Sequence, residues 1–138
     1  MEVTLLLADH AEAINGKLYV MGGGWTVLYA ADRPVNISIA AIVAVPWDET
    51  NRRHRVTLEL LDAEGVAVEV GGQPVLLNGE FEVGRPPGVK PGTSFNTPFV
   101  WTLAGLTLRG GSYEWKLLVD GEPQASRAFV VTAPPLSA

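Results

Sequence analysis

The chain has 138 residues, enough for a single domain spanning residues 1–138, and its 47% hydrophobic residues, 15 glycines and 10 prolines are typical of a globular protein of short strands and many turns. Its net charge of −5 argues against nucleic acid or an anionic membrane surface as a partner, since either needs a basic protein surface. The absence of cysteine excludes disulfides, thiolate catalysis and cysteine-ligated zinc.

The first predicted strand spans residues 2–8, with Val3, Leu5 and Leu7 on one face. The acidic Glu2 and a run of only three leucines are typical neither of a signal peptide nor of a membrane-spanning segment. We therefore expect a cytoplasmic protein that is not inserted in a membrane.

Glycines separate the next two predicted strands, residues 17–21 and 25–30. Three in a row, at positions 22–24, predict a bend or a place where another backbone comes close. The following strand, residues 36–45, has apolar residues on both faces, Ile42 among them, which indicates burial on both sides. We expect the second cover to be either a loop of the chain or another subunit.

The middle of the chain predicts a meander followed by a long loop. Residues 55–61 alternate between apolar and polar side chains and continue through a turn into residues 66–70. Residues 74–83 predict a weaker strand pair, and residues 84–94 a loop in which proline and glycine prevent helix and sheet. Loops of this length are often functional, although a solvated arm without a function is the favoured interpretation.

The C-terminal third predicts an antiparallel hairpin over residues 106–131, preceded by a strand at residues 99–103. Large apolar side chains recur at every second position of its first strand, which indicates one buried face. These side chains are Tyr113, Trp115, Leu117 and Val119.

The turn of this hairpin decides which side chains are buried. A two-residue loop at Asp120 and Gly121 would place Phe129 opposite Ser112, on the solvent face. We therefore predict a three-residue loop from Val119 to Gly121, with Gly121 in a left-handed bulge. The core positions of the second strand are then Phe129 and Val131, and the predicted pairs are Trp115 with Ala125 and Tyr113 with Arg127.

These elements together predict an all-β fold without substantial helix. About eight or nine strands separated by turns every 8–12 residues are typical of an antiparallel β-sandwich. Tyr113, which follows Leu108 and the pair Gly110 and Gly111, resembles the tyrosine corner of immunoglobulin-like domains, in which a tyrosine hydroxyl bonds to the upstream backbone. We therefore expect an immunoglobulin-like sandwich.

Two segments carry a resemblance to a known family. They are ADHAEAINGKLYVMGGGW at residues 8–25, and GRPPGVKPG followed by LTLRGGSYEWKLLVDGE. With its N-terminal ADxAxxxxGKLYxxGGGW motif, the chain resembles an uncharacterised family of small bacterial cytoplasmic β-sandwich proteins. The resemblance implies an immunoglobulin-like or related sandwich, and it brings no activity, substrate or catalytic residue.

Residues for catalysis or metal binding are scarce. His10 and His54 are the only histidines, and no G-x-S-x-G, P-loop or H-E-x-x-H motif is present. Asp9, His10 and Glu12 form the tightest group of potential metal ligands, for which a surface turn is the favoured interpretation. Carboxylates in the predicted loops keep calcium binding as an alternative, although no loop carries the repeated aspartates that are typical of calcium sites. We predict a protein that is not an enzyme, with no catalytic residue, resident metal or cofactor.

The tryptophans lead to two hypotheses about function. Trp101 and Trp115 fall on core-facing positions, whereas Trp25 follows the glycines and Trp47 follows a proline. The first hypothesis is a non-enzymatic interaction module that self-associates or binds a protein partner, using the strand of Ile42 and open sheet edges. The alternative is a module for a small ligand or carbohydrate, bound by exposed Trp25 and Trp47 and the 84–94 loop.

Overall fold

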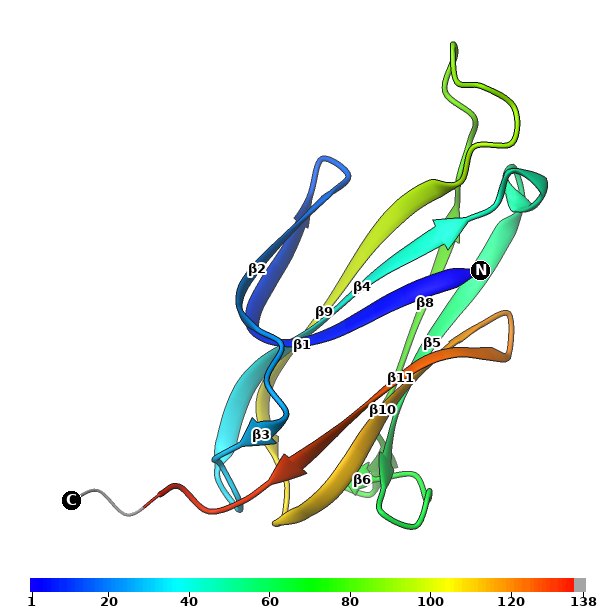
Figure 1. Ribbon diagram of the computed structural model, residues 1–138. Helices are drawn as coiled ribbons and strands as arrows, with labels where there is room; N and C mark the ends of the chain where they lie inside the picture. Colours follow the sequence, from blue (N-terminus) through cyan, green and yellow to red (C-terminus); the bar gives the residue numbers. More distant parts are fainter. Residues whose placement is uncertain (136–138) are drawn as a thin grey trace.

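The computed structural model describes residues 1–135, which form eleven β-strands and one short 3₁₀ helix. Two sheets face each other across an apolar core (Figure 1), so the fold is the expected β-sandwich. The strands outnumber the expected eight or nine because three of them have only two residues. Within the described residues, no helix is long and apolar enough to cross a bilayer.

The first sheet has four antiparallel strands in the order β2-β1-β4-β9. Their bounds are Glu2–Ile14 for β1, Lys17–Gly23 for β2, Pro34–Val45 for β4 and Phe95–Thr107 for β9. The predicted strands at residues 2–8, 17–21, 36–45 and 99–103 all lie within them.

The second sheet has five strands in the order β3-β11-β10-β5-β8, in which only β3 and β11 pair in parallel. Their bounds are Val27–Leu28 for β3, Glu122–Val131 for β11, Gly111–Val119 for β10, Arg53–Asp62 for β5 and Leu76–Glu82 for β8. The remaining elements are the ribbon of β6 (Glu69–Val70) and β7 (Gln73–Pro74), and the 3₁₀ helix η1 (Trp47–Glu49). The strand expected at residues 66–70 is thus reduced to its last two residues.

The core lies between the sheets and follows the period of two that the sequence shows. Alternate residues of β1, β5, β10 and β11 are buried, whereas β4 is buried at consecutive positions 37–41, and fully burying a large apolar side chain contributes about 1.5–3 kcal/mol. The largest of them are Trp115, Phe129, Leu5, Ile37, Ile39, Leu58, Leu60 and Leu117.

The hairpin of β10 and β11 corrects the predicted turn. Val119 pairs with Glu122, so Asp120 and Gly121 alone form the loop, with φ of 52° and 81°. The register then shifts within β11, where Gln124 is the extra residue between two successive pairs. Phe129 and Val131 face the core as predicted, but the pairs are wrong: Trp115 lies opposite Arg127, Leu117 opposite Ala125 and Tyr113 opposite Phe129.

The reason for this error is physical. A third loop residue and a bulge within the strand each add one residue, and either one restores the same alternation of faces. The hydrophobic pattern therefore cannot distinguish them, whereas the Asp-Gly pair, which tolerates two positive φ angles, favours the two-residue loop. The tyrosine corner is present, because the Tyr113 hydroxyl donates to the carbonyl oxygen of Arg109 at 2.8 Å.

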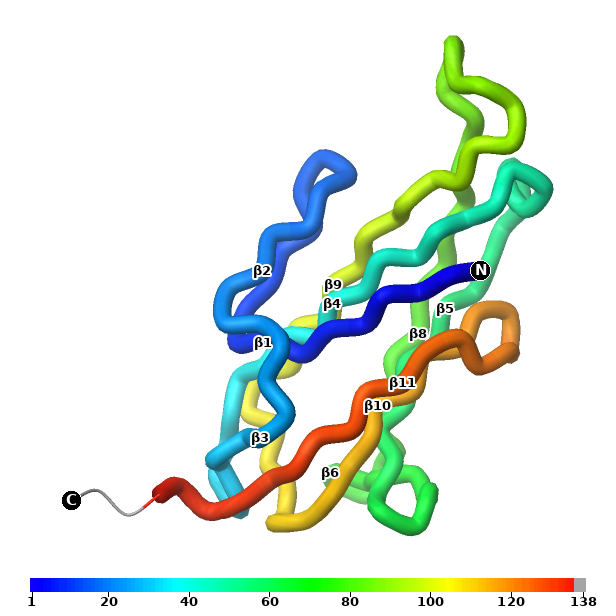
Figure 2. Tube along the Cα trace, viewed as in Figure 1, coloured from blue at the N-terminus to red at the C-terminus, as the bar shows by residue number. Residues whose placement is uncertain are grey.

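The two-sided burial of β4 has its explanation within the chain. After Ala8, β1 leaves β4 and continues with β2 as an arm, residues 9–23, that bends away from the first half of β1 (Figures 1 and 2). Cα atoms of this arm come within 8 Å of β4 and β9. Ser38 and Ala40, on the outer face of β4, are fully buried. The second cover of β4, which we expected to be either a loop of the chain or another subunit, is thus provided by the chain itself.

The glycines at positions 22–24 make this bend feasible. Gly22 and Gly24 have positive φ angles of 64° and 89°. A Cβ atom on Gly22 would collide with the side chain of Asp9, and one on Gly23 would lie 2.6 Å from Cγ1 of Val20. The chain bends at these glycines as predicted, but the atoms that would crowd a Cβ on Gly22 or Gly23 belong to side chains and not to another backbone.

Candidate functional site

The strand β2 is an open edge of the first sheet. It pairs with β1, and no described strand lies on its other side. Its residues from Leu18 to Met21 include neither a charge nor a proline, and the side chains of Tyr19 and Met21 are 52% and 68% exposed. An apolar edge of this kind offers unpaired N–H and C=O groups to another strand.

Three exposed apolar side chains of the arm lie on one of its faces, while Val20, 36% exposed, lies on the other. Tyr19 lies opposite Glu12 and Met21 opposite His10, and Ile14 on the same face is 46% exposed. His10 Nε2 lies 3.4 Å from a carboxylate oxygen of Glu12, with both side chains about half exposed. This face therefore combines three apolar side chains with the neighbouring polar side chains of His10 and Glu12 and with Lys17, which lies opposite Ile14.

Ile42 lies on the outer face of β4, opposite Thr4 on β1 and Pro98 on β9. It is half-buried, unlike its fully buried neighbour Ala40. Ile42 and the exposed residues of β2 belong to the same sheet but to different strands, and no described contact joins them. Because the chain covers part of this face, less of it is exposed than the sequence indicates, and a partner site at Ile42 stays a prediction.

Trp47 is held at its place in η1 by the long loop. The guanidinium carbon of Arg85 lies 4.0 Å from the centre of the indole ring, and the ring of Phe95 stacks at 6.1 Å. Arg85 also donates from Nε to the Thr50 hydroxyl at 2.6 Å and from Nη2 to the carbonyl of Trp47 at 2.7 Å. The 84–94 loop therefore supplies a cation that covers Trp47.

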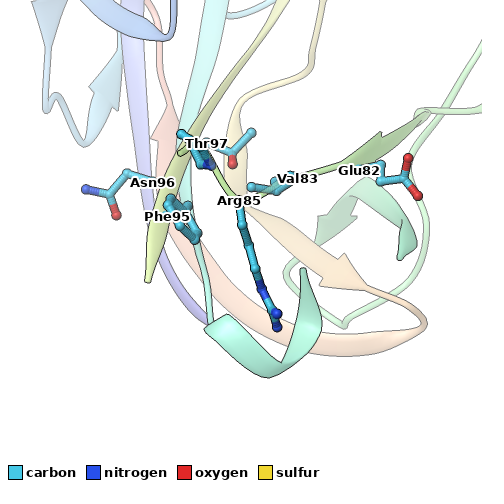
Figure 3. Close-up of a pocket in the computed structure, with 8 residues that line it drawn as sticks. Glu82, Val83, Arg85, Phe95, Asn96 and Thr97 are labelled. Atoms are coloured by element: carbon cyan, nitrogen blue, oxygen red, sulfur yellow. The ribbon is translucent and has the colours of Figure 1, made fainter. Parts of the chain in front are cut away.

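A hollow of about 560 Å³ lies at the base of this loop, between the ends of β8 and β9 (Figure 3). Its polar side chains point in different directions: Arg85 points toward η1, while Glu82 and Asn96 point away from it on opposite sides. Binding pockets for small ligands place polar groups that converge on the ligand. This hollow lacks such convergence.

Trp25 lies in a different environment. Its ring meets Phe129 edge-on, with centroids 6.1 Å apart, and its Nε1 is buried without a hydrogen-bond partner in the described residues. It precedes β3, whereas η1 with Trp47 lies near the other end of the sandwich (Figure 1). Both tryptophans are partly buried, and the structure does not bring them onto one surface.

Sequence reasoning missed a pair of buried His54 with half-exposed Asp120, which joins β5 to the turn between β10 and β11. His54 is 3% exposed, with Nδ1 at 2.7 Å from an oxygen of Asp120 and Nε2 at 2.7 Å from the carbonyl oxygen of Glu49. The other carboxylate oxygen of Asp120 accepts from the backbone N–H of Arg55. Because both ring nitrogens are bonded, His54 has no nitrogen left to act as a base, and its role is structural. No local motif connects two residues 66 positions apart.

Potential metal ligands do not converge in the described part of the chain. Residues 1–135 contain no group of three histidine, aspartate or glutamate side chains arranged to hold an ion. Within the group Asp9, His10 and Glu12, only His10 and Glu12 contact each other.

A family model described as "Family of unknown function (DUF6941)" matches residues 3–132, which is most of the chain. Membership of an uncharacterised family is thus confirmed, while the proposed N-terminal motif and a bacterial origin stay predictions. No curated protein matches the chain.

Proposed function

We propose that this chain, which belongs to the family DUF6941, is a non-enzymatic interaction module that self-associates through the open edge of β2. The observation that carries the proposal is the uncharged, proline-free segment from Leu18 to Met21 with exposed Tyr19 and Met21. Strand addition to such an edge is a common mode of protein recognition.

The other long edge strands carry features that oppose pairing. β8 ends in Glu80 and Glu82, and oxygens of Glu80 lie 3.9 Å from guanidinium nitrogens of Arg53 and Arg55. β9 contains Pro98, which cannot donate a backbone hydrogen bond. Charged residues and prolines on edge strands disfavour edge-to-edge association with another chain. Their absence from the centre of β2 therefore favours this strand as the interface.

A second copy of the chain fits this edge. In an antiparallel pair with its two-fold axis at Val20, Tyr19 of one protomer lies opposite Met21 of the other. Lys17 then lies opposite Gly23, so no like charges face each other. Because each chain carries a net charge of −5, the long-range repulsion should decrease with added salt, and the association should strengthen.

Light scattering of the full chain over a range of concentrations tests the proposal. We expect a mass that rises from 14.7 kDa toward twice that value. The double variant Tyr19→Lys, Met21→Lys should stay monomeric, because charges at the edge would be desolvated on pairing. The control Leu76→Lys, at a 45% exposed position of β8, should associate like the wild type. A strictly monomeric wild type, or a double variant that associates equally, would contradict the proposal.

A further inference from the structure

A cavity of about 300 Å³ lies between β1 and β11, at the side of the sandwich where the chain crosses from one sheet to the other. Leucines 6 and 7 of β1, the crossing segment 24–26, and residues 127 and 128 of β11 line it. Contacts between β1 and β11 keep the two strands close at this side. The cavity is therefore formed by elements of both sheets.

Arg127 is the only charged residue among those that line the cavity. It lies opposite Trp115 in the ladder, on the row of β11 that also carries Phe129 and faces the core. Arg127 is itself exposed, and its Nε donates to the carbonyl oxygen of Leu5 at 2.8 Å, which holds the guanidinium at the surface where β1 and β11 meet. No carboxylate of residues 1–135 lies within ion-pair distance of it, although the chain has 15 acidic residues.

Both sheets are open at the mouth of this cavity. β1 pairs with β2 only from Ala8 onward, and β11 pairs with β3 only at Val130 and Val131. The carbonyl oxygens of Leu5 and Leu7 accept from Arg127 and from the N–H of Gly24, so they point toward this open side. In an antiparallel strand the N–H of each residue points to the same side as its C=O.

We propose that this cavity binds a carboxylate attached to a small apolar group, with the guanidinium of Arg127 as its anchor. The planar guanidinium matches a carboxylate in geometry and charge, and its two terminal nitrogens have no hydrogen-bond partner in the described residues. The side chains of Leu6 and Trp25, which are both partly buried, provide the apolar wall for the attached group. The volume suits a ligand at the small end of the usual range.

Two sources of this chemistry differ in the group that is attached to the carboxylate. A free short-chain fatty acid has only an alkyl tail, which would lie against the apolar wall of the cavity. A peptide that ends in an apolar residue adds a backbone, which can pair with the open edge of β1. The shared requirement is the free carboxylate, and the two sources are separated by experiment.

The test is a titration of the ¹⁵N-labelled full chain, monitored by NMR. Hexanoate, and a short peptide ending in leucine with a free carboxylate, are the two probes; hexanamide and the amidated peptide are their uncharged controls. We expect saturable shifts at the Trp25 indole N–H and at Thr26 and Ala128 with the carboxylates alone. Stronger binding of hexanoate identifies a free acid, and stronger binding of the peptide identifies a chain terminus. Equal shifts with the amides would overturn the proposal.

Variants of Arg127 test whether its guanidinium binds the carboxylate of the ligand. Arg127→Gln should weaken binding by about tenfold or more, and Arg127→Lys should weaken it less, because the charge stays while the paired donors are lost. Arg53→Gln, at an exposed position on β5, is the control and should bind like the wild type. If Arg127→Gln does not fold, Thr26→Phe fills the cavity from an exposed position and should also abolish binding. Wild-type affinity in a folded Arg127→Gln or in Thr26→Phe would show that Arg127 only connects the sheets.

Discussion

The imidazole ring of His54 contacts three segments of the chain, two of which are distant from it in the sequence. It forms hydrogen bonds with Asp120, in the turn between β10 and β11, and with the carbonyl oxygen of Glu49 in η1. It also packs against Phe81 of β8, with the two ring centroids 5.3 Å apart. Both hydrogen-bond partners are acceptors, so the doubly protonated ring is the form that satisfies them. The residue therefore stabilises this end of the sandwich through its charge.

The charge of this pair makes the stability depend on pH. Burial lowers the pKa of His54, but the hydrogen bonds to Asp120 and to the Glu49 carbonyl, with the charge of Asp120, outweigh it and raise the pKa above 6.5. The hydrogen bond from His54 is the main cause that lowers the pKa of Asp120 below 3.8. The contribution of His54 is complete below pH 6.5 and is lost as pH rises through its raised pKa. That of Asp120 is complete above pH 3.8 and is lost as pH falls through its lowered pKa.

We predict that the free energy of unfolding decreases as pH rises from about 5 to about 8.5. His54→Gln should remove this dependence and should cost about 1–3 kcal/mol at the lower pH, because the buried imidazole loses its hydrogen bonds while water can hydrate the half-exposed Asp120. Urea unfolding at the two pH values measures both effects. His10→Gln, at an exposed position, is the control and should keep the wild-type dependence. A wild type whose stability is equal at both pH values would contradict the charged state of His54.

At the scale of elements, the arm of residues 9–23 depends on glycine at one position more than at another. Gly22 and Gly16 both have positive φ, 64° and 72°. A Cβ on Gly16 meets no atom within 4 Å, whereas one on Gly22 would collide with the carboxyl group of Asp9. An alanine at either position would therefore be strained by the positive φ angle, but only an alanine at position 22 would also collide with Asp9.

We predict that Gly16→Ala costs about 1–2 kcal/mol, the strain of a left-handed alanine. Gly22→Ala should cost more, about 2–4 kcal/mol, because Asp9 must also move. Urea unfolding gives the two values, and hydrogen exchange at Leu18 and Val20 shows whether the arm loosens first. Equal costs for the two variants would mean that the arm accommodates Asp9 elsewhere.

The same elements show how far sequence reasoning reaches. The alternation of side chains predicted which faces of β1, β5, β10 and β11 are buried, because burial follows the pleat of each strand. It did not predict the bulge at Gln124, because a bulge and a longer turn give the same alternation. The apolar outer face of β4 was recognised, but its cover by the arm depends on a bend whose direction no pattern specifies.

At the scale of the whole molecule, contacts across the sandwich carry no local signal in the sequence. Arg127 reaches the carbonyl of Leu5 from 122 positions away, and His54 reaches Asp120 from 66. Both arginine and aspartate are residues that usually stay at the surface. Composition and periodicity therefore predict the layers of the fold, while the polar contacts between the layers become visible only in three dimensions.

One apolar cluster joins the two sheets. Buried residues of β1 and β4 pack against buried residues of β5, β10 and β11, and no disulfide contributes. A core shared in this way should make the sheets unfold together. We therefore predict one transition in urea, with coincident curves from tryptophan fluorescence and far-ultraviolet circular dichroism.

A truncation in the core tests this coupling. Leu58→Ala, at a fully buried position of β5, should lower the free energy of unfolding by about 2–5 kcal/mol and shift both curves equally. Leu76→Ala, at a 45% exposed position of the neighbouring strand β8, should change it by no more than about 0.5 kcal/mol. If the two probes separated in Leu58→Ala, the second sheet would unfold before the first, and the sandwich would not be a single cooperative unit.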